Sequence, residues 1–308
     1  MDSVAIILEA PERLALRSLS LLPMASGDVL VEVDWSGVSS GTEKLLWTGR
    51  MPSFPGMGYP LVPGYESIGR IVDAGAEARG RIGEWVFVPG ASCYRDARAL
   101  FGGSARRVIL PQARAIPIPD SLGRDGILLA LAATARHAIE VGGVPDLVIG
   151  HGILGRLIAR IAVAIGGDAP TVWETNPDRR DAFGYTVIDP AGDDRRDYRA
   201  ICDASGAADV LDLAFARLAK GGQVVLAGFY GRLSFAFPPA SMRESGLRVV
   251  AEVAPVDIAA VLELLDIGLL DLDGLISHAR PAAEAGEAYP QAFSDPDCLK
   301  MVLDWRAV

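Results

Sequence analysis

The sequence has few cysteines and few histidines. Three of each occur among its 308 residues, and Cys93, Cys202 and Cys298 lie far apart with no C-x-x-C pair. This distribution supports neither a disulfide framework nor a zinc ribbon, and no two histidines have the spacing of a metal-binding pair. We therefore expect three reduced thiols, as in a cytosolic protein.

The chain also lacks a basic N-terminal region, a long apolar run and an excess of positive charge. Its first residues include acids rather than bases, which indicates a first strand instead of a signal peptide. No apolar run approaches the roughly 20 residues of a membrane span, and the best candidate, 152–167, is interrupted by Arg156 and Arg160. The net charge of −10 disfavours general binding to nucleic acid or anionic membranes, but it leaves room for a local basic pocket.

The most informative motif that is present is LVIGHGILG, at residues 147–155. A short apolar run leads into Gly150, Gly152 and Gly155, a helix-periodic segment follows, and a second short strand ends in Glu174. In such a unit the first glycine makes a tight turn, the second lets the backbone approach a pyrophosphate, and the third lets helix and strand pack closely. The pyrophosphate lies at the positive end of the helix, and an acidic residue about 20 positions later suits the ribose hydroxyls. This order of elements predicts a dinucleotide-binding site.

The pattern along the chain changes near residue 118. Before this point, many short strands separated by glycine and proline predict a partly open β-barrel or curled sheet. After it, strands and helices alternate, which predicts a parallel sheet with helices on both faces. The expected fold class is α/β, with a β-rich domain of residues 1–118 and 275–308 and a Rossmann doubly wound domain of residues 119–274.

Local patterns carry further expectations about single segments. Glycine and proline favour loops, whereas apolar residues at helical or alternating spacing favour helices or strands. We expect a loop at 45–62, a helix at 210–218 closed by Gly221 and Gly222, a strand at 248–253, an exposed helix at 280–288 and a last helix near 297–305.

Motifs in both halves of the chain carry a family resemblance. They are Gly37-Val38 with SGTE at 40–43, PGYESIG at 63–69, GEWV at 83–86, GGSA at 102–105, TARHA at 134–138 and the glycine turn. With these motifs, a β-rich domain, a Rossmann domain and a short return segment, the chain resembles the medium-chain dehydrogenase/reductase superfamily over nearly its whole length. The resemblance implies a GroES-like catalytic domain beside the cofactor domain.

Residues 39–72 closely resemble one branch of this superfamily. Members of that branch oxidise the 3-(1-hydroxyethyl) side chain of a chlorin or bacteriochlorin to an acetyl group with NAD, in bacteriochlorophyll biosynthesis. The resemblance implies a chlorophyllide or bacteriochlorophyllide substrate and a cytoplasmic enzyme, with peripheral contact to the photosynthetic membrane left open. Members of the family often form homodimers joined through the edges of the Rossmann sheets, and the sequence leaves the oligomeric state open.

The zinc-binding residues of the metal-dependent members are missing from this sequence. Ser40 stands at the first Cys position, Tyr65 at the His position and Ala130 at the second Cys position, and only Glu66 is retained. A hydroxyl, a phenol and a methyl group cannot replace the tetrahedral shell that zinc requires. The segment of the structural zinc lobe has a single cysteine, Cys93. We therefore predict that no metal is bound.

Alcohol oxidation by hydride transfer leaves a proton that a group within hydrogen-bond distance must accept. Thr42 matches the residue that relays this proton in many family members, and Tyr65 and Ser40 could hold the substrate oxygen in place of the metal shell. Tyr65 could act as base if a nearby cation such as Lys44 lowered its pKa, and Glu66 could orient the network or serve as base. For each of these side chains, a purely structural role stays open.

The expected cofactor is NAD rather than NADP, because Glu174 would repel a 2′-phosphate and accept ribose hydroxyls. Arg179 and Arg180 follow closely and could instead meet a phosphate or cap a solvated helix. His151, inside the glycine turn, could touch cofactor phosphates or be simply exposed. With the positions that approach adenine ribose or nicotinamide in the family, the candidate cofactor residues are Gly150, Gly152, Ile153, Leu154, Gly155, Glu174, Arg179, Thr134, Ala204 and Gly228.

Residues 45–62 could form one wall for a tetrapyrrole, which is a wide, flat, apolar plate with an anionic propionate. Apolar and aromatic residues on a loop need a partner, and the core, a second subunit or a ligand would each serve. Arg50 could pair with the propionate, as a guanidinium does well. The candidate substrate residues are Trp47, Arg50, Met51, Phe54, Met57 and Tyr59.

Two other functions stay open. A quinone or enoyl reductase of the same superfamily also lacks zinc, but such enzymes usually use NADPH, which Glu174 disfavours. A nicotinamide-binding protein without catalysis is disfavoured by the polar set at Ser40, Thr42, Tyr65 and Glu66.

Overall fold

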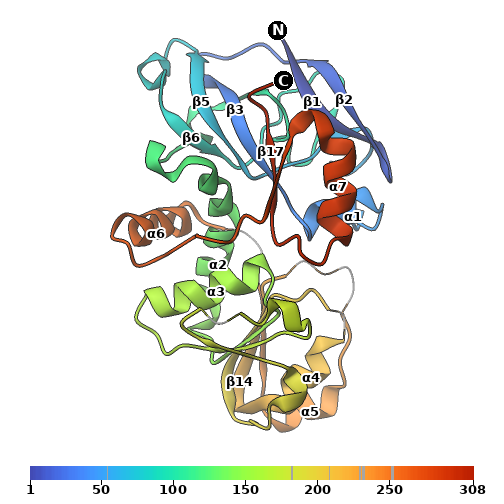
Figure 1. Ribbon diagram of the computed structural model, residues 1–308, viewed down its shortest axis with the longest axis vertical. Coiled ribbons are helices and arrows are strands. Elements are labelled where there is room, and N and C mark those ends of the chain that lie inside the picture. The colour runs from blue at the N-terminus through green and yellow to red at the C-terminus, as the bar shows by residue number, and fades with distance from the viewer. Residues whose placement is uncertain (54, 182, 208, 229, 231–232, 251–252) are drawn as a thin grey trace. The chain divides into compact units, whose positions relative to one another are not determined.

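The structure is a computed structural model, and it describes residues 1–308 apart from 54, 182, 208, 229, 231–232 and 251–252. Two compact units divide the chain (Figure 1): unit 1 comprises Met1–Ala130 and Leu272–Val308, and unit 2 comprises Leu131–Asp271. From the sequence, the boundaries between the two domains were expected at residues 118/119 and 274/275. The last segment of the chain therefore returns to the first unit.

Unit 1 consists mainly of short strands in two sheets. One sheet has the order β2-β1-β4-β7, and the other has the order β16-β17-β3-β5-β6-β9 with β8 paired to β3. The strands are β1 (Asp2–Ala10), β2 (Arg13–Ser20), β3 (Asp28–Val38), β4 (Leu61–Val62), β5 (Ser67–Ala74), β6 (Trp85–Val88), β7 (Arg98–Ala99), β8 (Arg107–Pro111), β9 (Ile116–Pro117), β16 (His278–Pro281) and β17 (Met301–Asp304). The helices are α1 (Thr42–Trp47) and α7 (Ala285–Ser294), with 3-10 turns η1 (Arg79–Arg81), η2 (Gln112–Arg114), η3 (Asp120–Leu128) and η6 (Ala282–Glu284).

The long strand β3 organises unit 1, because it pairs antiparallel with β5, β8 and β17. β17 comes from the C-terminal segment, and its Val302 lies opposite Gly37. Helix α7 from the same segment lies beside α1 (Figure 1), where the rings of Trp47 and Tyr289 are 6.2 Å apart. The end of the chain thus packs next to the segment that carries most of the candidate catalytic residues.

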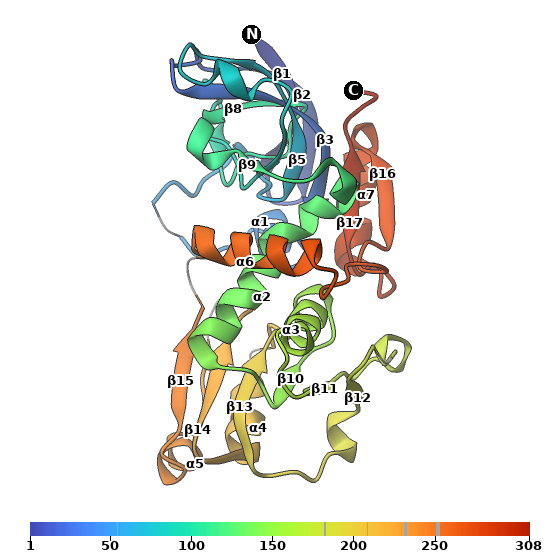
Figure 2. The ribbon, with the colours of Figure 1, turned by 90° about the vertical axis from the view of Figure 1, so that its left-hand side faces the viewer.

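Unit 2 is a six-stranded, fully parallel sheet of order β12-β11-β10-β13-β14-β15 (Figure 2). This order reverses between β10 and β13, and in this fold dinucleotides bind beyond the carboxyl ends of the strands at such a point. The elements are α2 (Leu129–Gly142), β10 (Leu147–Ile149), α3 (Ile153–Ala164), β11 (Thr171–Trp173), η4 (Pro177–Arg179), β12 (Thr186–Ile188), η5 (Pro190–Gly192), β13 (Tyr198–Asp203), α4 (Val210–Arg217), β14 (Leu218–Leu226), α5 (Phe237–Met242), β15 (Gly246–Val249) and α6 (Pro255–Asp266). The expected fold class is confirmed.

The C-terminal expectations were wrong in detail. Residues 301–304 form strand β17 instead of a helix, because their apolar side chains are buried on both faces between neighbouring strands and α7. The segment expected as an exposed helix at 280–288 begins in strand β16, and three of its alanines are buried, since α7 packs them against the core of unit 1.

Three other local expectations also need correction. The start of the expected loop at 45–62 is helical, because α1 extends to Trp47. The pair Gly221 and Gly222 does not close a helix but lies within β14, which begins directly after α4. The expected strand at 248–253 is β15, which ends at Val249; residues 251 and 252 of that segment lie outside the described residues.

Candidate functional site

Three hydroxyl side chains form the polar centre of unit 1. Thr42 begins helix α1, and Tyr65 lies between β4 and β5. The Tyr65 hydroxyl donates to Ser39 Oγ at 2.8 Å and also interacts with the Thr42 side chain. Burial, followed by the nearby Glu66, raises the pKa of Tyr65. Tyr65 therefore stays protonated and acts as a hydrogen-bond donor or acceptor rather than as a phenolate.

A buried carboxylate, Glu43, lies beneath this centre. Its two oxygens accept hydrogen bonds from the Ser39 backbone N–H at 2.5 Å and from the Tyr289 hydroxyl at 2.8 Å. Burial raises the pKa of Glu43 to about 7, with a further contribution from the charge of Glu66. Glu43 therefore changes charge near neutral pH and is held by residues from both ends of the chain.

A second carboxylate, Glu66, forms an ion pair with Lys300 inside unit 1. The two side chains are 0% and 1% exposed. Glu66 Oε2 accepts from Lys300 Nζ, whereas buried Oε1 has no partner among the described residues. Burial raises the pKa of Glu66, although Lys300 acts in the opposite direction. A Cβ atom at Gly37 would overlap Glu66, so this glycine makes room for the pair.

The donor set around these residues does not suit zinc. Ser40 is exposed, Tyr65 is half-buried, and neither offers the thiolate or imidazole that the metal prefers. Within the described part of the chain, no three His, Cys, Asp or Glu residues cluster as metal ligands would. The three cysteines are free and buried.

The suggested action of Lys44 on Tyr65 is contradicted. Lys44 is exposed, and its Nζ donates to the Phe293 carbonyl at 3.0 Å. The pKa of Tyr65 is raised rather than lowered. Lys44 contributes to the contact between α1 and the end of α7 instead, because it caps a carbonyl there.

Four of the candidate substrate residues have apolar contacts within unit 1, and one of them, Met51, is buried. Trp47 is half-buried and packs against the core beside Tyr289 and Phe293, at 6.2 and 6.4 Å between ring centroids. Met51 is buried in a small apolar cluster, against which Met57 and Tyr59 also pack. These contacts agree with the core alternative, and the ligand wall stays a prediction. Arg50 is exposed, and Phe54 lies outside the described residues.

The glycine turn of unit 2 has the geometry expected of a dinucleotide site. Gly150 has φ +93°, which favours glycine, and a Cβ there would meet Ser205 at 2.9 Å. Gly152 precedes the first turn of α3 and faces open space. A Cβ on Gly155 would overlap the Gly150 carbonyl. Gly150 and Gly155 are thus required by the turn and by the close packing of helix and strand, whereas the role of Gly152 toward a pyrophosphate stays a prediction. Ile153 and Leu154 begin the helix.

Glu174 directly follows β11 and bridges two loops. Its carboxylate accepts from the His151 N–H at 3.1 Å and from the Asn176 N–H at 2.8 Å. Arg180 is engaged elsewhere, because it binds two backbone carbonyls and the carboxylate of Asp189. Arg179 contributes its carbonyl, which lies 2.6 Å from His151 Nδ1.

The remaining candidate cofactor residues follow the carboxyl ends of neighbouring strands or lie on α2. Ala204 follows β13 and donates to the Ile149 carbonyl at 2.9 Å, and Gly228 follows β14. Thr134 lies half-buried on α2. His151 is fully buried, and its Nε2 lies 2.9 Å from the Tyr185 hydroxyl. Its ring therefore supports the turn from within, and the alternative of simple exposure is wrong.

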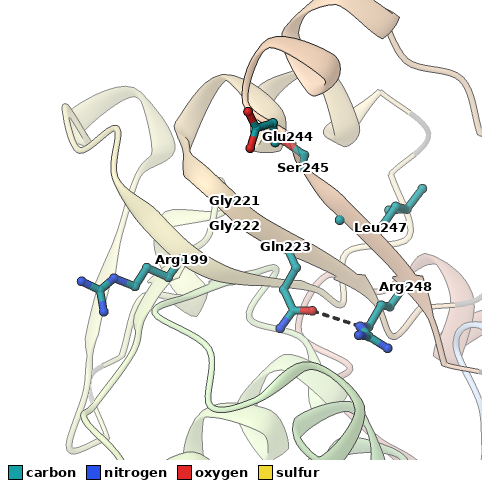
Figure 3. Close-up of a pocket in the computed structure, with 9 residues that line it drawn as sticks. Arg199, Gly221, Gly222, Gln223, Glu244, Ser245, Leu247 and Arg248 are labelled. Atoms are coloured by element: carbon teal, nitrogen blue, oxygen red, sulfur yellow. Dashed lines mark hydrogen bonds between the residues drawn. The ribbon is translucent and has the colours of Figure 1, made fainter.

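A pocket of about 540 Å³ lies elsewhere in unit 2, near the amino ends of β13, β14 and β15 (Figure 3). Arg248 donates to Gln223 Oε1 at 3.0 Å on its wall, and Arg199 and Glu244 also line it. Cofactors in this fold bind at the carboxyl ends of the strands. This pocket is therefore at the wrong end of the sheet for the cofactor.

Four residues in and around the polar centre were not predicted from the sequence. Ser39 and Glu43 flank the residues that were singled out, whereas Tyr289 and Lys300 are more than 200 positions away. A lysine within an apolar C-terminal segment was the one available signal, since fully buried lysines are rare unless paired.

Comparisons with known proteins agree with this architecture. Residues 25–120 match the alcohol dehydrogenase GroES-like domain. The chain is 54% identical over 316 residues to 2-desacetyl-2-hydroxyethyl bacteriochlorophyllide A dehydrogenase of Cereibacter sphaeroides, covering 100% of this chain and 99% of that protein. The chain belongs to the medium-chain dehydrogenase family. This dehydrogenase is also 52% identical over 311 residues to the protein of the same name from Rhodobacter capsulatus, with 99% of each chain covered.

Solved structures share the fold of this dehydrogenase at low sequence identity. An alcohol dehydrogenase from Escherichia coli in complex with NADH superimposes with a TM-score of 0.85 at 19% identity, covering 99% of both chains. A zinc-binding dehydrogenase from Sinorhizobium meliloti bound to NADP has a TM-score of 0.83 at 21% identity and covers 99% of this chain and 100% of its own. None of the described helices has the length and apolar character needed to cross a bilayer.

Proposed function

We propose that this dehydrogenase oxidises the hydroxyethyl side chain of a chlorophyllide or bacteriochlorophyllide to an acetyl group, with NAD as acceptor and without zinc, in bacteriochlorophyll biosynthesis. The observation that carries the proposal is the full-length identity of 54% and 52% to two dehydrogenases named for 2-desacetyl-2-hydroxyethyl bacteriochlorophyllide A. The hydroxyl network of unit 1 supports it, because alcohol oxidation needs groups that hold the oxygen and accept its proton.

The residues of unit 2 fit a nicotinamide dinucleotide. The backbone at Gly152 is open at the start of α3, so it can receive a pyrophosphate at the positive end of the helix. Glu174 favours NAD over NADP, since its carboxylate would repel a 2′-phosphate. Arg180 does not offset this charge, because Asp189 and two carbonyls engage it. When bound, NAD supplies the hydride acceptor.

The polar centre of unit 1 handles the substrate hydroxyl. Thr42 and Tyr65 hold the oxygen by hydrogen bonds, with Ser40 at the exposed rim. As the carbonyl forms, the proton of the substrate hydroxyl is relayed through these hydroxyls to solvent at the exposed Ser40. Glu66 acts on this network through its charge, which raises the pKa of Tyr65 and so favours the protonated phenol. Glu43 holds Ser39 in place by accepting a hydrogen bond from its backbone N–H, and burial raises the pKa of Glu43 to about 7.

The same residues support the proposed independence from zinc. A serine, a tyrosine and an alanine stand where the family places thiolate and imidazole ligands, at Ser40, Tyr65 and Ala130. The substrate oxygen would therefore be held by hydroxyl groups. We expect purified, active enzyme to contain no stoichiometric zinc by elemental analysis and to keep its rate in the presence of chelators.

The decisive assay mixes the purified protein with NAD and 3-hydroxyethyl bacteriochlorophyllide a and follows the absorbance change as the acetyl group forms. Turnover with NAD, and much slower turnover with NADP, is expected. Turnover of a quinone with NADPH in the absence of this oxidation would instead identify a reductase and overturn the proposal.

A second copy of this chain is the proposed partner. β15 is the last strand of the parallel sheet, so one of its edges carries no neighbouring strand among the described residues. Its Leu247 and Val249 are 41% and 63% exposed. An unpaired edge with apolar side chains favours pairing with another chain. We propose a homodimer in which the β15 edges of two copies join the sheets.

A further inference from the structure

Phe101 is a large apolar side chain at the surface of unit 1, next to the hydroxyl network. It is 43% exposed, and its ring packs edge-on against Tyr65, with centroids 5.2 Å apart and planes at 72°. Tyr65 in turn donates to Ser39. The exposed face of an aromatic ring thus adjoins the phenol that is proposed to hold the substrate oxygen.

The backbone that carries Phe101 is held from two sides. Its carbonyl accepts from the Ala91 N–H at 2.9 Å, and the preceding Leu100 N–H donates to the Val62 carbonyl at 2.9 Å. Gly102, with φ +83°, approaches so closely that a Cβ would overlap the Ala91 carbonyl. The ring is therefore presented by a fixed support, and binding on it requires little additional ordering.

The other aromatic residues near this surface are engaged in packing. Trp47 packs against Tyr289 in the core of unit 1, and the Tyr59 hydroxyl donates to the Leu46 carbonyl. Leu100, the neighbour of Phe101, packs against the small apolar cluster. Trp47 and Tyr59 thus have contacts within unit 1, whereas Phe101 keeps an exposed face.

We propose that Phe101 is a specificity-determining residue whose ring stacks against the flat ring system of the substrate while the hydroxyethyl group reaches Thr42 and Tyr65. This inference rests on the proposed function and extends it to the recognition of the macrocycle. A tetrapyrrole offers a broad π surface, and aromatic rings stack on such surfaces in an offset arrangement. A small alcohol would gain nothing from this contact.

The test compares Phe101→Leu, which keeps an apolar side chain but removes the ring, with Phe101→Tyr, which keeps the ring. For Phe101→Leu we expect the Kd of 3-hydroxyethyl bacteriochlorophyllide a, measured by fluorescence titration, and its KM to rise roughly three- to tenfold, as loss of one aromatic contact predicts. Its kcat and its KM for NAD should stay at the wild-type level. Phe101→Tyr should bind like the wild type.

Phe237→Leu is the matched control, because Phe237 is an exposed phenylalanine of unit 2, 71% exposed, and its replacement should leave chlorin binding unchanged. An unchanged Kd in Phe101→Leu, or an equal loss in Phe237→Leu, would overturn the inference. Binding that depends on Phe101 without any turnover in wild-type protein would contradict the proposed function alone. Wild-type protein that does not bind the pigment would contradict both.

Discussion

Two buried carboxylates of unit 1 show how burial and partners set the behaviour of single residues. Glu66 has a cation as partner, Lys300, whereas Glu43 has only neutral donors, Ser39 and Tyr289. Burial raises the pKa of both, and for Glu43 the value reaches about 7. Motif spacing identified Glu66 as a candidate, but the importance of Glu43 depends on contacts that the motif does not contain.

Replacing either hydroxyl of the polar centre should slow the reaction. In Thr42→Val and Tyr65→Phe, a group proposed to hold the substrate oxygen is lost with little change in volume. We expect kcat to fall about 10²-fold or more, in the range typical of proton-transfer groups, with the Kd for NAD near normal. Steady-state kinetics and NAD titration provide the two readouts. Wild-type rates in both variants would remove these residues from the chemistry.

Glu43 should make stability depend on pH in a definite direction. Its pKa rises from 4.5 to about 7 on folding, so the folded protein binds more protons than the unfolded chain between these values. The stabilisation is present below pH 4.5 and is lost as the pH rises through 7, which amounts to about 3 kcal/mol.

This dependence is measured by urea unfolding at several pH values in the wild type and in Glu43→Gln. The amide cannot titrate. The difference in unfolding free energy between the two proteins should therefore change by about 3 kcal/mol between pH 4.5 and pH 7. A constant difference would show that Glu43 does not titrate there.

At the scale of elements, the C-terminal segment completes unit 1. Helix α7 supplies Tyr289, and the residue before β17 supplies Lys300. The sequence suggested a terminal helix there because Leu299, Val302 and Leu303 have helical spacing. A short buried strand and a helix give similar apolar runs, and pairing with β3 decides between them.

Lys300→Met should destabilise the protein strongly, because it leaves Glu66 buried without its cation. Removal of one partner of a buried pair typically costs about 3–5 kcal/mol. The double variant Glu66→Gln with Lys300→Met has no unpaired charge and should recover a large part of this loss. Urea unfolding of the three proteins tests the point, and equal stability of the single and double variants would contradict it.

At the scale of the whole molecule, the free edge of β15 determines how copies of the chain can meet. The Val250 N–H donates to Leu226 within the sheet, so the neighbouring N–H of Val249 points away from β14. An edge donor of this kind is available to a second chain, and proline blocks such an edge.

We therefore expect Val249→Pro to convert a dimer into a monomer, with the Rossmann sheet intact. Light scattering coupled to gel filtration gives the mass, and NAD binding reports on the sheet. Val249→Thr, which keeps the N–H and strand propensity, should remain dimeric. A wild-type monomer, or a Val249→Pro dimer, would exclude this interface.

The sequence by itself determined the fold class and the glycine turn, since these depend on local spacing: Gly150 and Gly155 each have a steric role within one strand–helix unit. Its resemblance to the family also led to the prediction that Ser40 and Tyr65 stand at the positions of zinc ligands. Only the tertiary structure decided that Trp47 packs against the core, that Phe101 is partly exposed and that Lys300 pairs with Glu66. These outcomes depend on contacts between segments far apart in the chain, and local periodicity carries no information about such contacts.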